Sequence, residues 1–245
     1  MKLLLSLVCL LLLSVACAST KDPSTPTAAY YLKEGEKLFE KELYEEAITM
    51  WEKARDSYYS PELNTLAEMR IAEAHFMGKN YIEAAAAYED FLKQHPDHER
   101  TPQVLYRLGL SYYEQILSID RDQTATRNAL ATFQNFLKRF PNDPDAEEAR
   151  TYIARCTDRL AEHELYVGRF YLRAGHYEAA VKRLEDVFVH YPDYDGRDRA
   201  FLYLGQAYLA AGHPDAAMKA FNSLFEEFPR SEHALKAQKL LEKQN

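Results

Sequence analysis

The sequence predicts an all-α protein whose folded body is an α-solenoid of five helix–turn–helix repeats, closed by a C-terminal capping helix. The 245 residues are 47% hydrophobic but include only 8 glycines, and no stretch alternates apolar and polar residues as half-buried strands do. A pattern of small, aromatic and proline residues recurs along the chain, and a single helical hairpin cannot bury its apolar face without further copies.

The clearest copy of this pattern runs from Tyr166 to Pro192. Gly168 and Ala180 are small where the two helices are expected to cross, Gly175 supplies the turn, and Pro192 ends the second helix. The space around the crossing is filled by Tyr171, Leu184 and Val187. These are the spacings of a tetratricopeptide repeat (TPR), a unit of about 34 residues.

Residues 1–16 predict a secretory signal peptide, because Lys2 precedes an apolar run to Leu13 and then small residues. The next residue is Cys17, and the segment resembles a bacterial lipoprotein signal, although Ser14 stands where leucine is usual. That resemblance implies cleavage before Cys17, a diacylglyceryl group on its sulfur, and N-acylation by a fatty acid such as palmitate. Ala18 in the following position favours export to the outer membrane by the same resemblance. The alternative is an ordinary signal peptide that contains a cysteine.

The mature chain begins with a polar stretch and continues into three repeats. Residues 17–27 are interpreted as the lipidated cysteine and a flexible tether, since they are short, polar and contain two prolines. Residues 28–144 form the N-terminal block of repeats 1–3. The third repeat is lengthened, because 32 positions separate Gly109 from Pro141, against 24 from Gly168 to Pro192. About eight extra residues around Gln115–Thr126 therefore form a candidate contact loop.

The C-terminal block covers residues 145–245 and holds a long helix, repeats 4 and 5 and the cap. Neither Pro nor Gly interrupts the helical pattern between Asp145 and Gly168, so one helix of about thirty residues is expected there. Ser231 is a plausible N-cap for a last helix to about Lys243. Cys156 has no partner once Cys9 leaves with the signal and Cys17 carries the lipid, and is interpreted as a small core residue.

The concave face of a TPR array is lined by the first helix of each repeat. The positions that face inward in repeats 1–3 are rich in apolar and aromatic residues, which suits a pocket for varied apolar peptides. The candidate peptide-binding residues are Leu32, Phe39, Leu66, Met69, Phe76, Met77, Tyr106, Leu110 and Tyr113. The alternative is that a tightly wound superhelix packs some of these side chains against itself.

Arginines gather around repeat 4 although the net charge of the chain is -8. The acidic balance makes a nucleic-acid partner improbable, but a local basic cluster suits an acidic partner domain. The candidate docking residues are Arg159, Arg169, Arg173, Arg197 and Arg199. The alternative is a solvated face on which arginines pair with nearby glutamates.

No pattern in the chain predicts catalysis, a metal or a cofactor other than the covalent lipid. The run from His95 to Glu99 spans a proline-containing turn between repeats, which favours a surface loop over a metal cluster. His163-Glu164 lacks a second histidine four residues after the first, so it is not a zinc-protease helix. The sequence also lacks a Gly-rich phosphate loop and a nucleophile elbow. A non-enzymatic protein is therefore expected.

The lipobox, the five repeats, the lengthened third repeat and the long helix together resemble the BamD lipoproteins of the β-barrel assembly machinery. The local likeness is strongest in Asp120-Arg121-Asp122, in Asp158-Arg159-Leu160-Ala161 and in Tyr191-Pro192-Asp193. The resemblance implies a lipid-anchored protein on the periplasmic side of the outer membrane. It also implies docking to the POTRA domains of the barrel subunit BamA, association with other lipoproteins of the complex, and binding of unfolded outer-membrane proteins through their C-terminal signals.

Two other interpretations remain open from the sequence. One is a different periplasmic TPR lipoprotein, such as a pilotin for secretin or pilus assembly. The other is a scaffold that tethers and regulates a cell-wall enzyme.

Overall fold

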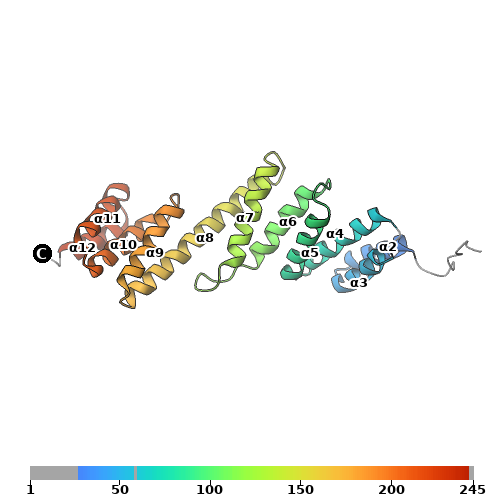
Figure 1. The fold of residues 1–245 in the computed structure, drawn as a ribbon, viewed down its shortest axis with the longest axis horizontal. Helices are drawn as coiled ribbons and strands as arrows, with labels where there is room; N and C mark the ends of the chain where they lie inside the picture. The colour runs from blue at the N-terminus through green and yellow to red at the C-terminus, as the bar shows by residue number, and fades with distance from the viewer. Residues whose placement is uncertain (1–26, 58–59, 243–245) are drawn as a thin grey trace, which may run out of the picture. The chain divides into compact units, whose positions relative to one another are not determined.

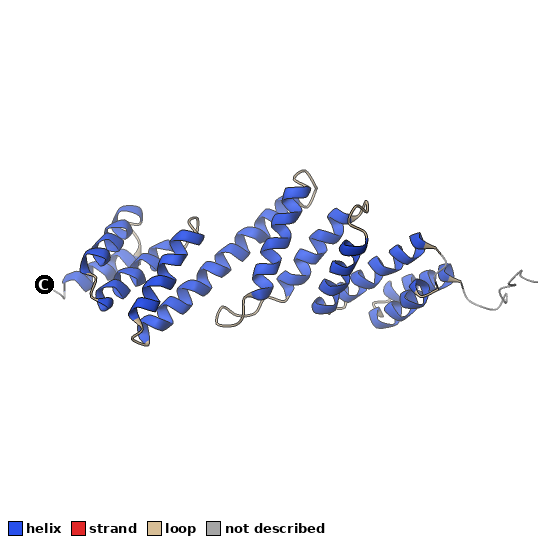
Figure 2. Cartoon of the chain, viewed as in Figure 1, coloured by secondary structure: helices blue, strands red, loops and turns tan. Residues whose placement is uncertain are grey.

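The computed structural model describes residues 27–57 and 60–242, so Cys17 and the expected signal peptide lie outside the described residues. Within these ranges the regular structure is helical throughout (Figures 1 and 2). The helices are α2 (Ala28–Phe39), α3 (Tyr44–Arg55), α4 (Pro61–Met77), α5 (Tyr81–Gln94), α6 (Thr101–Glu114), α7 (Thr124–Arg139), α8 (Ala146–Arg173), α9 (Tyr177–His190), α10 (Arg197–Ala211), α11 (Pro214–Glu227) and α12 (Glu232–Glu242). The predicted all-α class is confirmed.

The chain divides into two compact units at a boundary inside α4, between Arg70 and Ile71. In the first unit α2 and α3 form a hairpin around Trp51, which is fully buried and donates from Nε1 to the carbonyl of Leu32 at 3.2 Å. The division into repeat blocks 28–144 and 145–245 concerns a different property, the grouping of repeats, and stays a prediction.

One packing rule recurs in the helical hairpins of both units. A glycine in the first helix faces a large side chain 16 positions later in the second, as in Gly168 and Leu184, where an added Cβ would lie 2.7 Å from Cγ. The same spacing joins Gly35 to Trp51 and Gly205 to Phe221. In the third repeat Gly109 faces Phe133, 24 positions later. The excess of eight positions confirms the lengthened connection.

The long helix is confirmed as α8, which has 28 residues between Asp145 at its N-cap and Ala174 at its C-cap. Its first part packs against α7 and its last part against α9 (Figure 1). Cys156 is fully buried, and burial raises the pKa of its thiol to about 11, as expected for a small core residue. Gly175 follows α8 with φ of 81°, a conformation that glycine adopts without strain.

Candidate functional site

The insertion lengthens the connection between α6 and α7 into an ordered loop, residues 115–123. The last residue of the loop, Gln123, holds it together. The Gln123 side chain is 2% exposed and donates from Nε2 to the carbonyls of Ser118 at 3.1 Å and Arg121 at 3.0 Å. The Gln123 side-chain oxygen in turn accepts from Thr126 Oγ1 at 2.9 Å. Because a buried amide fixes two loop carbonyls at once, the loop has a defined shape.

The loop is fastened to the middle of α8 by two side chains. Arg159 donates from Nη2 to the carbonyl of Leu117, and His163 donates from Nδ1 to the carbonyl of Ile119 at 2.6 Å. The inserted residues and the additional length of α8 therefore fit each other: the insertion supplies the carbonyls, and the long helix supplies their donors.

Loss of the Arg159 guanidinium is expected to loosen this loop. In Arg159→Gln the bond to Leu117 disappears, and one net hydrogen bond of about 1 kcal/mol corresponds to an open population about fivefold larger. Native-state trypsin cleavage after Arg121 should accelerate by that factor. Arg155→Gln is the matched control, because Arg155 lies on the same helix over the ring of Tyr152. Equal cleavage rates in the two variants would show that Arg159 does not hold the loop.

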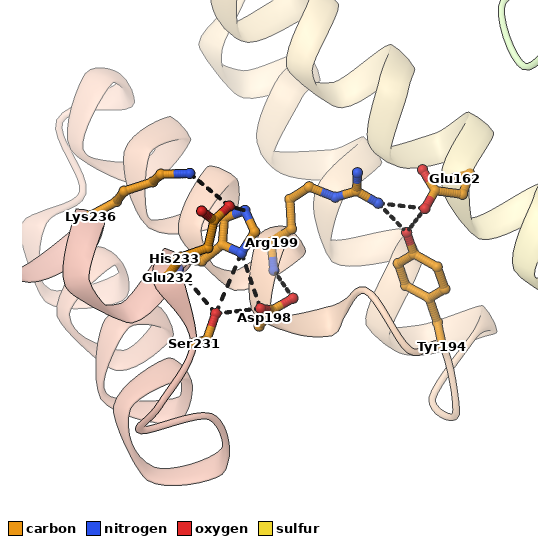
Figure 3. Close-up of polar contacts among 8 residues, drawn as sticks. All are labelled: Glu162, Tyr194, Asp198, Arg199, Ser231, Glu232, His233 and Lys236. Atoms are coloured by element: carbon orange, nitrogen blue, oxygen red, sulfur yellow. Dashed lines mark hydrogen bonds and ion pairs between the residues drawn. The ribbon is translucent and has the colours of Figure 1, made fainter.

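Three of the five predicted docking arginines are engaged within the chain. Arg159 holds the loop, Arg197 pairs with Glu227 at 2.7 Å, and Arg199 pairs with Glu162. Arg199 also donates to the hydroxyl of Tyr194 at 2.7 Å, and that hydroxyl donates to Glu162 (Figure 3). The partners belong to neighbouring elements rather than to the same helix, so these arginines join α10 to α8 and to α11. The docking role of the five residues stays a prediction.

The other two arginines, Arg169 and Arg173, are exposed on the last turns of α8. The Arg169 guanidinium carbon lies 5.3 Å from the ring centre of Tyr203 in α10, which is a cation–π distance. No ion pair of either guanidinium is recorded with any residue in the described ranges 27–57 and 60–242. Of the predicted cluster, this pair is the part available to a partner.

A second polar network fastens the capping helix to α10. Ser231 Oγ and His233 Nδ1 both donate to Asp198 Oδ2, the latter at 3.0 Å, and Ser231 Oγ accepts from the His233 backbone N–H at 3.0 Å (Figure 3). Ser231 therefore caps α12 as predicted. Burial alone raises the pKa of Asp198, but these hydrogen bonds outweigh it, so the pKa lies below the ordinary value.

The depressed pKa of Asp198 predicts a pH-dependent contribution to stability. The carboxylate stabilises the folded state above its unfolded pKa of about 4, and this contribution is lost as the pH falls through the lower folded value. At pH 7 Asp198→Asn should lower the unfolding temperature by about 2–4 °C, for a loss of about 1 kcal/mol. At pH 3 the difference in unfolding temperature between Asp198→Asn and the wild type should be smaller. Asp193→Asn, at an exposed position, is the control. If Asp198→Asn lowers the unfolding temperature equally at pH 7 and pH 3, the ionised Asp198 carboxylate does not stabilise the fold.

The predicted peptide-binding residues differ widely in exposure. In the first unit Leu32 and Met69 are buried, and Phe39 and Leu66 are half-buried. In the second unit Tyr106 and Leu110 are buried, Phe76 and Tyr113 are half-buried, and Met77 is 44% exposed. The burial of these four side chains agrees with the self-packing alternative, and the ring of Tyr106 lies 5.8 and 5.6 Å from those of Phe133 and Phe136 in α7. Peptide binding by this set remains a prediction.

The two histidines of the run from His95 to Glu99 pack around one phenylalanine. The rings of His95 and His98 lie 5.0 and 5.4 Å from that of Phe91. In the described portion of the chain no group of three or more His, Cys, Asp or Glu side chains is placed to hold a metal ion. No helix within residues 27–57 and 60–242 has the length and apolarity that a membrane crossing requires.

Tyr194, Asp198 and His233 hold these networks together, yet nothing in the sequence marks them, because their partners lie 32 to 35 positions away in the chain. The sequence draws attention to His163 only as part of His163-Glu164, which lacks the second histidine of a zinc-protease helix. Its contact with the inserted loop spans 44 positions and could not be anticipated from spacing.

Comparison with known proteins identifies relatives along most of the chain. Residues 23–220 match the model of the YfiO family, described as outer membrane lipoprotein. The outer membrane protein assembly factor BamD of Rickettsia prowazekii is 31% identical over 193 residues, 78% of this chain and 76% of the relative. BamD of Caulobacter vibrioides is also 31% identical, over 144 residues, but the match spans only 47% of that protein's length and 59% of this chain.

Among solved structures, the TPR2AB domain of yeast Sti1 in complex with pHSP90 is similar over 88% of this chain and 84% of that chain. Its sequence identity is 16% and its TM-score is 0.43. The names of the curated relatives denote assembly factors and not enzymes. The sequence resemblance is thus confirmed at the level of family: the chain belongs to the YfiO family of outer membrane lipoproteins, together with the BamD assembly factors.

Proposed function

We propose that this protein is a non-enzymatic lipoprotein of the outer-membrane β-barrel assembly complex. It binds the C-terminal signals of unfolded outer-membrane proteins and docks to the POTRA domains of a BamA-like barrel subunit. The observation that carries this proposal is the match, over most of the chain, to relatives named outer membrane protein assembly factor BamD. Stacked helical hairpins support it, because such arrays offer extended surfaces for other polypeptides.

The proposed location is the periplasmic face of the outer membrane, where the protein is held by acyl chains on Cys17. The sequence of the first 17 residues supports this anchor. The proposed partners are the barrel subunit, other lipoproteins of the complex and unfolded outer-membrane proteins. No cofactor besides the covalent lipid is part of the proposal.

Affinity purification of the tagged full chain from detergent-solubilised outer membranes tests the proposal. Recovery of a barrel protein with POTRA domains is the expected result. Recovery of a secretin, or of a cell-wall enzyme, without that barrel protein would favour the alternative scaffolds and remove the assembly role.

Phe76 is the best-placed residue for testing peptide binding in the second unit. Its ring is half-buried, lies 5.5 Å from that of Tyr81 and carries the Arg107 guanidinium 4.9 Å above it. In Phe76→Glu the new carboxylate would pair with Arg107 and replace the apolar surface with a polar one. The affinity for a barrel-protein peptide with an aromatic C-terminal residue, followed by photo-cross-linking, should fall at least about fivefold, since a contact of this size contributes roughly 1–3 kcal/mol.

The control for this test is Ile82→Glu, a comparable change at a side chain that is 69% exposed on α5. Circular dichroism should show the same helical content in both variants. Undiminished cross-linking of Phe76→Glu would exclude Phe76 from the binding surface.

A further inference from the structure

A small cavity of about 80 Å³ lies where the inserted loop, α8 and α10 meet. Ile119 lines it from the loop, Leu165, Tyr166 and Arg169 from α8, and Arg199 and Tyr203 from α10. Leu165 is 3% exposed and belongs to the core. The cavity therefore places two aliphatic side chains, Ile119 and Leu165, beside aromatic and charged ones, all within the second compact unit.

The one carboxylate on the cavity wall, that of Glu162, is already compensated. It accepts from the Arg199 guanidinium and from the Tyr194 hydroxyl, so neither it nor Arg199 contributes a free charge (Figure 3). The charge available to a ligand is therefore that of Arg169, which is exposed and whose guanidinium lies over the ring of Tyr203.

The cavity continues into an exposed stripe along α8. Arg173 lies one turn beyond Arg169, and Tyr166 and Phe170, 38% and 51% exposed, occupy adjacent positions four residues apart. Exposed aromatic side chains beside arginines are typical of the central contacts of protein interfaces. The stripe consists of Tyr166, Arg169, Phe170 and Arg173.

We propose that the cavity and this stripe form a docking site for an acidic protein segment that inserts one branched aliphatic side chain. The volume is about half of the roughly 150 Å³ that accommodates benzene in an engineered apolar cavity, so a leucine or valine suits it better than an aromatic ring. Carboxylates flanking that side chain would bind Arg169 and Arg173. This proposal rests on the proposed docking role and gives it a site and a partner chemistry.

Two observations favour an acidic protein segment over an anionic membrane surface. A membrane is broad and flat, whereas this site is a cavity sized for one side chain. The chain as a whole carries a net charge of -8, which opposes approach to an anionic bilayer but leaves a local pair of arginines able to bind carboxylates.

The wall that Ile119 forms is held in place before a ligand binds, because the Ile119 carbonyl accepts from His163. A preformed wall lowers the entropic cost of binding.

The test is fluorescence anisotropy with the purified full-length protein in detergent. The probe is a labelled peptide in which one leucine is flanked by glutamates, compared with peptides that carry asparagine for leucine or glutamine for glutamate. The first peptide should bind most tightly, and its affinity should fall with salt. Arg169→Gln should weaken binding about tenfold, whereas Arg155→Gln, at an arginine that also lies over a tyrosine on α8, should not.

A second pair of variants tests the cavity wall. Ile119→Asp places a negative charge at the cavity and should weaken binding, whereas Leu117→Asp, at a loop side chain that is 56% exposed and outside the cavity, should not. Both variants should keep the wild-type helical content.

Three results would overturn the proposal: equal affinities for the three peptides, unchanged binding by both Arg169→Gln and Ile119→Asp, or binding of phosphatidylglycerol-containing vesicles through Arg169 without binding of the peptide. None of these would remove the assembly role, because recovery of the POTRA-bearing barrel protein tests that role separately. If Arg169→Gln also loses that barrel protein while Arg155→Gln keeps it, the cavity is the place where docking occurs.

Discussion

Replacement of Gly205 by valine is expected to destabilise the C-terminal hairpin strongly. An added Cβ at this position would lie 2.5 Å from Cζ and 2.7 Å from Cδ1 of Phe221, which is fully buried between α10 and α11. Valine adds two further methyl groups where even the Cβ has no room. Overpacking of this kind costs about 3 kcal/mol, which outweighs the few tenths gained because valine is a better helix former than glycine.

Thermal unfolding followed by circular dichroism should show a decrease of about 6–12 °C for Gly205→Val. Ala210→Val is the matched control, because Ala210 is exposed near the end of the same helix and its change should cost under about 1 kcal/mol. If both variants unfold at the same temperature, the close crossing of α10 and α11 does not limit the residue at position 205.

Replacement of Cys17 by alanine is expected to release the protein from the membrane fraction. Each buried CH₂ contributes about 0.8 kcal/mol, so several acyl chains on one residue hold a protein stably, and their loss removes the proposed anchor. Fractionation of cells should find Cys17→Ala in the soluble periplasmic fraction and the wild type with the outer membrane.

Cys156→Ala is the control for this change, because its thiol is fully buried in α8 and has no part in anchoring. That variant should remain with the outer membrane. Persistent membrane fractionation of Cys17→Ala would argue against a lipid anchor, and the intact mass of the mature wild-type protein would give the modification directly.

Much of the fold could be predicted from local spacing. The 16 positions between a small residue and its large partner reflect one geometry, in which two helices cross closely after a tight turn. The hairpins could therefore be predicted wherever a glycine or alanine precedes a large side chain by this interval. The insertion could be predicted because the interval from Gly109 to Pro141 is eight positions longer than the corresponding interval from Gly168 to Pro192. The long helix followed from the absence of any residue that would end it.

The candidate site was less predictable, because charge and composition do not reveal partners distant in the chain. The arginines around repeat 4 form one group in the sequence, yet Arg197 and Arg199 form ion pairs with neighbouring helices, and Arg169 and Arg173 remain exposed. Inward-facing positions were likewise indistinguishable from core positions, since Leu110 and Met77 are both apolar but only Met77 is substantially exposed.

The sequence by itself determined the helical repeats, the place of the insertion, the capping helix and the family, because each depends on residues close together in the chain or on their order. Only the tertiary structure decided which side chains the inserted loop contacts and which charged side chains remain available to a partner. Arg159 and His163 reach the loop across 42 and 44 positions, and the cavity beside Arg169 exists because the loop, α8 and α10 converge there. Such contacts depend on how the repeats stack, a property that no single repeat contains.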